Sequence, residues 1–268
     1  MFYSLGSNYS VTHGDVTSPT GAGTAVTGSA SLDTKGSYAQ LTSSTSIQAA
    51  GFIVHHVKST NNSTDTLIDI AIGGSGSEQI IVSNLLNSVV AFPGVQYFFP
   101  IGIPAGTRIA ARLQAHAASR VDWIHVTLTN GHPSYAQVET WGADTAQSRG
   151  TSIDGGGTAN TKSTYVQLVA STGFATKQVM FAIGNQGGAT RSSNDFLFDV
   201  AVDIGGNKQI IFADMGLHNL VSQTPYPVVF GPYNMALPAG SNIYVRTQSL
   251  DNSVSITRSF DIVGYGIA

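Results

Sequence analysis

The sequence contains an internal repeat, which limits the possible folds more than any other feature. Four blocks recur in order at intervals of 127, 130, 130 and 134 positions (165 − 38, 197 − 67, 209 − 79 and 237 − 103). The blocks are Tyr38-Ala39-Gln40-Leu41 with Tyr165-Val166-Gln167-Leu168, Leu67–Ile72 with Leu197–Val202, Gln79-Ile80-Ile81 with Gln209-Ile210-Ile211, and Ile103–Thr107 with Leu237–Ser241. Since the order is kept and the interval drifts only slightly, we infer a tandem duplication.

The repeat divides the chain into two predicted domains, residues 1–142 and 143–268. Each has the commonest size of a domain, about 100–150 residues, and is long enough to bury its own core. Two separate tandem domains, or two domains packed into one pseudo-symmetric body, both satisfy the repeat.

The repeated blocks have the periodicity of β-strands. Ile68, Ile70 and Ile72 alternate with other residues, and the second copy repeats the alternation. This period of two is typical of half-buried strands. Gly-rich turns follow both blocks and predict a hairpin in each copy. We also expect Asp69 and Asp199 to face outward.

The Pro-Ala-Gly blocks predict a further strand in each copy. In the first copy alternation turns Ile109, Ala111 and Leu113 inward and Ala110 and Gln114 outward, and in the second it turns Ile243, Val245 and Thr247 inward. Helical patterns are poor; the best candidate is Asn84–Val90, with Met215–Val221 as its counterpart. Many short strands joined by Gly, Pro and Ser predict an all-β fold of two similar β-sandwich, jelly-roll-like domains.

Composition excludes several classes of protein. Only 10% of the residues are charged, and the 12 Lys and Arg do not outnumber the 15 Asp and Glu, so no nucleic-acid partner is expected. Without cysteine there are no disulfides and no thiolate chemistry. No apolar run reaches the ~18 residues of a membrane helix, so no membrane span is expected. The first residues lack the pattern of a secretory signal.

No motif predicts catalysis, a cofactor or a metal. Gly73-Gly74-Ser75-Gly76-Ser77 lacks the last glycine of a nucleophile elbow. Six of the seven histidines lie in the first half and none in a repeated block, which disfavours a shared metal site. Asp69 and Asp199 fit structural positions better than a glycosidase pair. A Ca²⁺ site built from Asp195, Asp199 and Asp203 is the remaining alternative. We therefore expect a protein that is not an enzyme.

Three residues are candidates for contact with a partner or ligand. Arg112 and Arg246 occupy equivalent positions, which suits a contact with a protein or an acidic glycan made by both copies, or an arginine stem that covers apolar surface. Trp123 alternates with Ile124, so it is either exposed, as an interface or sugar-stacking residue, or part of the core.

The paired segments Ile103–Ala110 and Leu237–Tyr244, together with the duplicated strand blocks, resemble the structural proteins of tailed-bacteriophage virions. Low charge, abundant Gly, Ser and Thr, and the absence of cysteine agree with this resemblance. It implies jelly-roll sandwiches that serve as head decoration (cement) modules, or as tail and fibre modules that contact the host. It implies no catalytic residue.

The expected function is therefore a structural component of a phage virion, assembled in the host cytoplasm. We expect a head decoration protein that stabilises the capsid through contacts with other virion proteins, and a homo-oligomer. The first alternative is a carbohydrate-binding, host-recognition module of a fibre, motivated by Trp123 and Trp141. The second is a polysaccharide depolymerase, for which no paired acids stand out.

Overall fold

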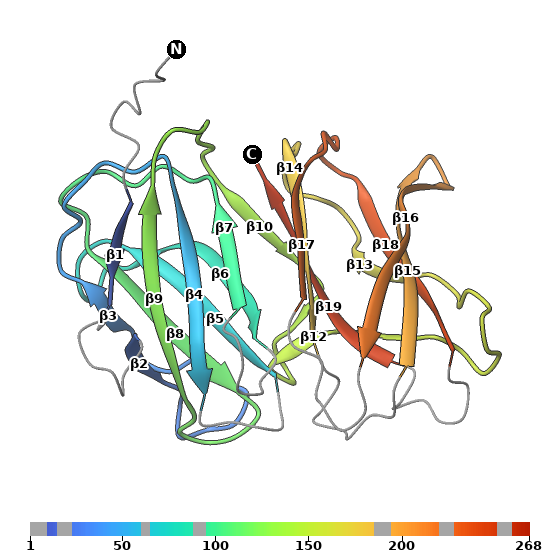
Figure 1. The fold of residues 1–268 in the computed structure, drawn as a ribbon, viewed down its shortest axis with the longest axis horizontal. Helices are drawn as coiled ribbons and strands as arrows, with labels where there is room; N and C mark the ends of the chain where they lie inside the picture. Colours follow the sequence, from blue (N-terminus) through green and yellow to red (C-terminus); the bar gives the residue numbers. More distant parts are fainter. Residues whose placement is uncertain are drawn as a thin grey trace, which may run out of the picture.

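The computed structural model describes residues 10–14, 23–59, 65–87, 95–184, 194–219, 228–250 and 259–268. Regular structure in these residues consists of strands alone, as Figure 1 shows. The first nine strands are β1 Val11–His13, β2 Thr24–Thr27, β3 Ala39–Thr42, β4 Gly51–Ser59, β5 Thr66–Ile72, β6 Gln79–Asn87, β7 Val95–Phe99, β8 Ile109–Ala115 and β9 Val121–Thr129. The others are β10 Val138–Trp141, β11 Ala143–Asp144, β12 Arg149–Asp154, β13 Val166–Val169, β14 Gln178–Gly184, β15 Asn194–Ile204, β16 Asn207–Asn219, β17 Val228–Asn234, β18 Asn242–Ser249 and β19 Ser259–Ile267.

Each copy is a sandwich of two antiparallel sheets. In the first copy β9, β4 and β7 are neighbours, with β1 and β2 both paired to β9, and the facing sheet has the order β3-β8-β5-β6. In the second copy β19, β14 and β17 are neighbours, with β10 and β12 both paired to β19, and the facing sheet has the order β13-β18-β15-β16. These orders are those of a jelly roll, so the prediction of two duplicated jelly-roll-like sandwiches is confirmed.

Backbone hydrogen bonds repeat along with the strands. The amide of Gly106 donates to the carbonyl of Thr45, and that of Gly240 donates to Thr172, both at 2.8 Å. Both glycines have φ near +80°, a conformation that suits residues without a Cβ. The repeated Pro-Ala-Gly block is therefore a turn that ties the same two segments in each copy.

The division of the chain after residue 142 stays a prediction. β10 precedes that point, yet it pairs with β19 in register from Val138↔Ile267 to Trp141↔Gly264. It occupies the place beside β19 that β1 occupies beside β9.

The helical candidates are wrong where the structure describes them. Asn84 to Asn87 lie in β6, and Met215 to Asn219 lie in β16; the remaining candidate residues lie outside the described part. Asn84 has φ 53° at a bulge between β5 and β6, and its amide donates to the Asp69 carboxylate at 2.9 Å. This local kink breaks the strand alternation in the sequence.

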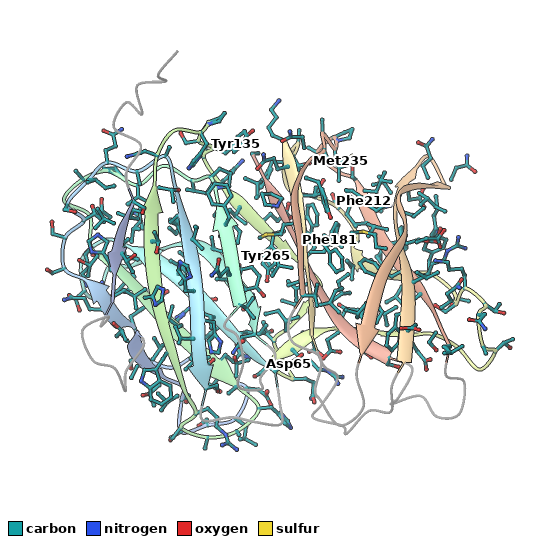
Figure 2. The ribbon with its side chains drawn as sticks, viewed as in Figure 1. Asp65, Tyr135, Phe181, Phe212, Met235 and Tyr265 are labelled. Atoms are coloured by element: carbon teal, nitrogen blue, oxygen red, sulfur yellow. The ribbon has the colours of Figure 1, made fainter. Side chains whose placement is uncertain are left out.

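The two copies share one body. The first core includes Met180, Ala182, Val263, Tyr265 and Ile267 from the second copy. Tyr265 lies at the boundary of the copies (Figure 2), where its hydroxyl accepts from the amide of Leu86 at 2.9 Å and contacts the carbonyl of Asn84 at 3.1 Å. Both faces of β19 are consequently buried. Of the two arrangements that the repeat allows, the chain adopts the packed one.

Among the residues described, the structure has no helix able to cross a membrane.

Candidate interaction surfaces

The first-copy arginine, Arg112, belongs to an ionic cluster on the outer face of its four-stranded sheet. Its Nε lies 2.8 Å from Oδ2 of Asp69, a residue that is only 1% exposed. The other carboxylate oxygen accepts from Nζ of Lys35, also at 2.8 Å. The guanidinium lies 4.8 Å from the ring centroid of Tyr38. Because β5 and β8 place Asp69 opposite Arg112 in register, the strand pairing itself builds this contact.

The second-copy arginine, Arg246, has the same surroundings. Its Nε lies 2.8 Å from Oδ2 of Asp199, which is 2% exposed, and its guanidinium lies 4.6 Å from the ring centroid of Tyr165. Lys162 donates to Oδ1 of Asp199 at 2.7 Å. The amide of Asp214, at φ 51°, donates to the same oxygen at 2.9 Å. The two candidate arginines therefore anchor a duplicated cluster.

Burial and ion pairing have opposite effects on the pKa of the second-copy carboxylate, Asp199. Burial by itself raises the pKa of Asp199, but the hydrogen bonds from the Asp214 amide, Lys162 and Arg246 outweigh it and hold the pKa below its ordinary value. In the first copy, burial lowers the pKa of Lys35 although Asp69 opposes the shift. The pairing therefore favours the charged carboxylate in the second copy, whereas in the first copy burial disfavours the charged form of Lys35.

The structure extends one expectation about the acidic residues and decides one alternative. Asp69 and Asp199 point outward from the sandwich core but are buried rather than solvated, because the cation and tyrosine side chains cover them. The proposed Ca²⁺ site is not assembled: no group of three or more His, Asp or Glu suited to a metal occurs among the described residues. Both Asp199 oxygens already accept from cationic side chains.

The alternation expected along β8 is also incomplete. Ile109, Ala111 and Leu113 are buried as predicted, but Ala110 and Gln114 are buried too. The amide of Gln114 donates to the carbonyls of Asp33 and Thr145. Thr145 belongs to the hairpin between β11 and β12, so a segment of the second copy covers this end of the first-copy sheet. In β18 the expected alternation holds throughout.

Trp123 lies on a different surface, the outer face of β9 and β4. It is half-buried, as are His125 and Thr127 further along β9. His125 stacks on His55 of β4 with ring centroids 4.3 Å apart, and Nε2 of His55 lies 3.0 Å from Oγ1 of Thr127. Burial, and then the neighbouring His125, lower the pKa of His55 to about 4, so the pair is neutral at pH 7. Sequence reasoning did not find this pair.

The matching face of the second copy makes the contact between the copies. Strand register aligns Trp123, His125 and Thr127 with Asp261, Val263 and Tyr265. The same face thus carries polar and aromatic side chains in one copy and mostly apolar ones in the other.

Two further features of the surface can be recognised only from the arrangement of the sheets. Ile80 and Ile210 are equivalent in the repeat and are each 45% exposed. On the second copy only, Nζ of Lys208 lies 4.3 Å from the ring centroid of Tyr244, whose hydroxyl accepts from Gln167 at 3.0 Å. Trp141, by contrast, is 1% exposed and cannot meet a ligand.

Comparisons with known proteins find similar structures but no family. No family model and no curated protein sequence matches the chain. A crystal structure of peptide-N(4)-(N-acetyl-β-D-glucosaminyl)asparagine amidase is similar with 9% identity, covering 97% of this chain and 96% of that one, at a TM-score of 0.43. A chain of Sulfolobus turreted icosahedral virus is 11% identical, with coverages of 97% and 90% and a TM-score of 0.39. The tandem CBM22 domains of Paenibacillus barcinonensis Xyn10C are 14% identical, with coverages of 86% and 82% and a TM-score of 0.27.

The prediction that the chain is not an enzyme is contradicted by this comparison. The similar structures include several of the amidase, among them the glycosylasparaginase of Flavobacterium meningosepticum, at 10% identity. They also include proteins of virus particles and a carbohydrate-binding module pair. Likeness at this level supports no argument about function.

Proposed function

We propose that the chain is a structural component of a virus particle, a decoration protein on the outside of a phage head. The supporting observation is that a single body carries one outer sheet face twice. The phage assignment comes from the sequence resemblance, and the repeated face is what a protein binding a lattice of identical subunits would use.

The repeated face can be followed across the four strands of each sheet. In the first copy, strand register places Gln40, Ala110, Ala71 and Ile80 in one row. In the second copy the corresponding row is Gln167, Tyr244, Ala201 and Ile210. Each row ends on an isoleucine that is 45% exposed, beside the buried ionic cluster. Equal exposure of an apolar residue at both places favours the same use of both faces.

Physical chemistry supports a lattice partner. Only 10% of the residues are charged, so little charge must be desolvated when such a face is covered. Two weak contacts joined in one body gain avidity without any new interaction. The shared core between the copies fixes the distance between the two faces, which reduces the entropy lost on binding.

The test is cosedimentation of purified protein with particles that lack it. We expect Ile80→Asp and Ile210→Asp each to weaken binding, and the double variant to lose far more than either alone. Leu32→Asp, at a residue that is also exposed, is the matched control and should bind normally. Absence of the protein from purified particles, or full binding by the double variant, would refute the proposal.

A second candidate function, binding of a carbohydrate, is favoured by one observation. The second copy alone carries Tyr244 beside Tyr165, with ring centroids 6.4 Å apart, and the polar Gln167 and Lys208 at their rims. Aromatic rings flanked by hydrogen-bonding groups suit a sugar. The first copy has Ala110 instead of Tyr244. Tyr244→Ala should therefore abolish binding to any glycan identified on an array, while Tyr38→Ala should not. Retained binding by Tyr244→Ala would exclude this surface.

A further inference from the structure

The contact between the two copies uses different surfaces on its two sides. The second copy contributes the outer face of β19 and β14, and the hairpin that contains Thr145. The first copy contributes β6, through Asn84 and Leu86, and the end of β8 at Gln114. Among the described residues, such a head-to-tail contact leaves one surface of each kind that the other copy does not cover.

The receiving surface that the first copy does not cover lies on the second copy. A hollow of about 470 Å³ is lined by Asn160, Asp195, Phe196, Leu197, Gly216, Leu217, Gln248, Ser249 and Leu250. Gly216 and Gln248 stand 130 and 134 positions after Leu86 and Gln114 (216 − 86 and 248 − 114), the offsets of their repeat blocks. The hollow therefore occupies the place that the second copy fills on the first. Leu250 at its rim is 55% exposed.

The corresponding docking surface is the outer face of β9 and β4 on the first copy, which contains Trp123, His125 and His55 and which the second copy does not cover. These residues stand in register with Asp261, Val263 and Ala182 of the buried face. All three are half-buried, so the face offers aromatic surface that is still accessible.

We infer that a second copy of this chain binds here, its β9–β4 face seated on the β16 edge and hollow of the first chain's C-terminal copy. Residue sizes at the two contacts are complementary. Inside the chain, Gly184 packs closely on Leu86, since a Cβ on Gly184 would lie 2.9 Å from Leu86 Cδ2. Between chains, Val57 stands 127 positions before Gly184 (184 − 57), at the β-bulge that β4 has between His56 and Lys58, and Gly216 stands at the position of Leu86. The larger residue is thus on the receiving surface inside the chain and on the docking surface between chains.

Polarity at this contact predicts a reversible association. Thr127 replaces Tyr265, so the two hydrogen bonds of the Tyr265 hydroxyl to β6 have no counterpart. His55 and His125 would approach the side on which Asp195 lines the hollow. A charge-poor contact with fewer buried apolar groups fits a subunit interface that forms on assembly, whereas the internal one is permanent.

The experiment is sedimentation velocity over a range of concentrations, compared with the 27.9 kDa of one chain. Gly216→Leu restores the first-copy residue. It should fold, because the nearest atom to its new Cβ is Leu197 Cδ2 at 3.9 Å, and it should weaken self-association at least tenfold by filling the space for Val57. Trp123→Asp should do the same from the other side. Leu32→Ser, at an exposed residue that belongs to neither surface, is the control and should associate normally.

Mixing the two variants gives the decisive outcome. Each keeps one intact surface, so Gly216→Leu and Trp123→Asp chains should form a 1:1 dimer that cannot grow, although each alone is a monomer. A wild type that stays monomeric at millimolar concentration, unaltered association of Gly216→Leu, or a mixture without dimers would each overturn the inference. These outcomes are independent of particle binding, which is tested at Ile80 and Ile210.

Discussion

The outer face of β9 and β4 in the first copy matches that of β19 and β14 in the second in strand register. The two faces differ in burial. The second is buried in a core that both copies share, through Met180, Val263 and Tyr265. The first carries the stacked histidines and Trp123 at half burial. The two faces are equivalent in the duplication, and the less polar of them is the one buried between the copies. The predictions that follow separate what the copies share from what divides them.

The largest difference is expected at Tyr265 and its first-copy equivalent, Thr127. Tyr265→Ala removes a fully buried ring and a hydroxyl that contacts β6, so the free energy of unfolding should fall by about 4 kcal/mol. Thr127→Ala, at a half-buried site, should cost about 0.5 kcal/mol. Denaturant unfolding measures both. Similar losses for the two variants would show that the faces are not used differently.

Tyr265→Phe isolates the hydroxyl. The ring contacts remain, but the amide of Leu86 loses its acceptor in a buried site, so a loss of about 1–3 kcal/mol is expected. An unchanged free energy of unfolding would mean that this hydrogen bond does not stabilise the contact between the copies.

The ionic clusters should behave alike in the two copies. Asp69→Ala leaves Lys35 and Arg112 without their carboxylate, and Asp199→Ala does the same to Lys162 and Arg246. Breaking a buried pair costs about 3–5 kcal/mol, and the partly exposed cations place both variants near 3 kcal/mol. Denaturant unfolding of the two single variants and their double variant tests the equality. A clear difference between the two losses of unfolding free energy would show that the clusters are not equivalent.

The histidine pair, which occurs in the first copy, predicts that the stability of the protein depends on pH. The pKa of His55 falls to about 4 in the folded state, from an ordinary value of 6.5, so the folded protein resists protonation. Stability is then fully present above pH 6.5 and is lost as the pH falls toward 4. Since water screens a half-exposed pair, we expect a loss of about 1 kcal/mol between pH 7 and pH 4.5.

The control for this dependence is His55→Ala, which copies Ala182 of the second sheet. Its unfolding free energy should change less with pH over that interval, as measured by denaturant titrations at several pH values. A wild-type profile that the substitution leaves unaltered would assign the dependence to other groups.

Sequence reasoning found the duplication, the all-β class and the strands around the repeated blocks, because alternation is a local property. It missed the strand character of Asn84–Asn87, since the bulge at Asn84 is held by the distant Asp69. It placed Asp69 and Asp199 on the outward side of their strands but did not predict their burial, because this depends on lysine and tyrosine side chains from other segments.

The candidate surfaces were only partly visible for the same reason. The equivalence of Arg112 and Arg246 could be predicted from the repeat, and each lies in the equivalent ionic cluster of its own copy. The pairing of His55 with His125 depends on the register between β4 and β9, which no single block records. The hollow beside Gly216 could be interpreted as a receiving surface only after the first copy showed what fills its counterpart.

The smallest effect is expected where the copies are most alike, at the arginines. Arg112→Lys and Arg246→Lys keep the positive charge but lose the planar guanidinium over Tyr38 and Tyr165. Each should cost about 0.5–1 kcal/mol by denaturant unfolding, the usual worth of an exposed cation–π contact. If these residues serve only to cover the carboxylates, particle binding by both lysine variants will equal that of wild type. Loss of binding without further loss of stability would instead make the arginines part of the contact surface, equally in both copies.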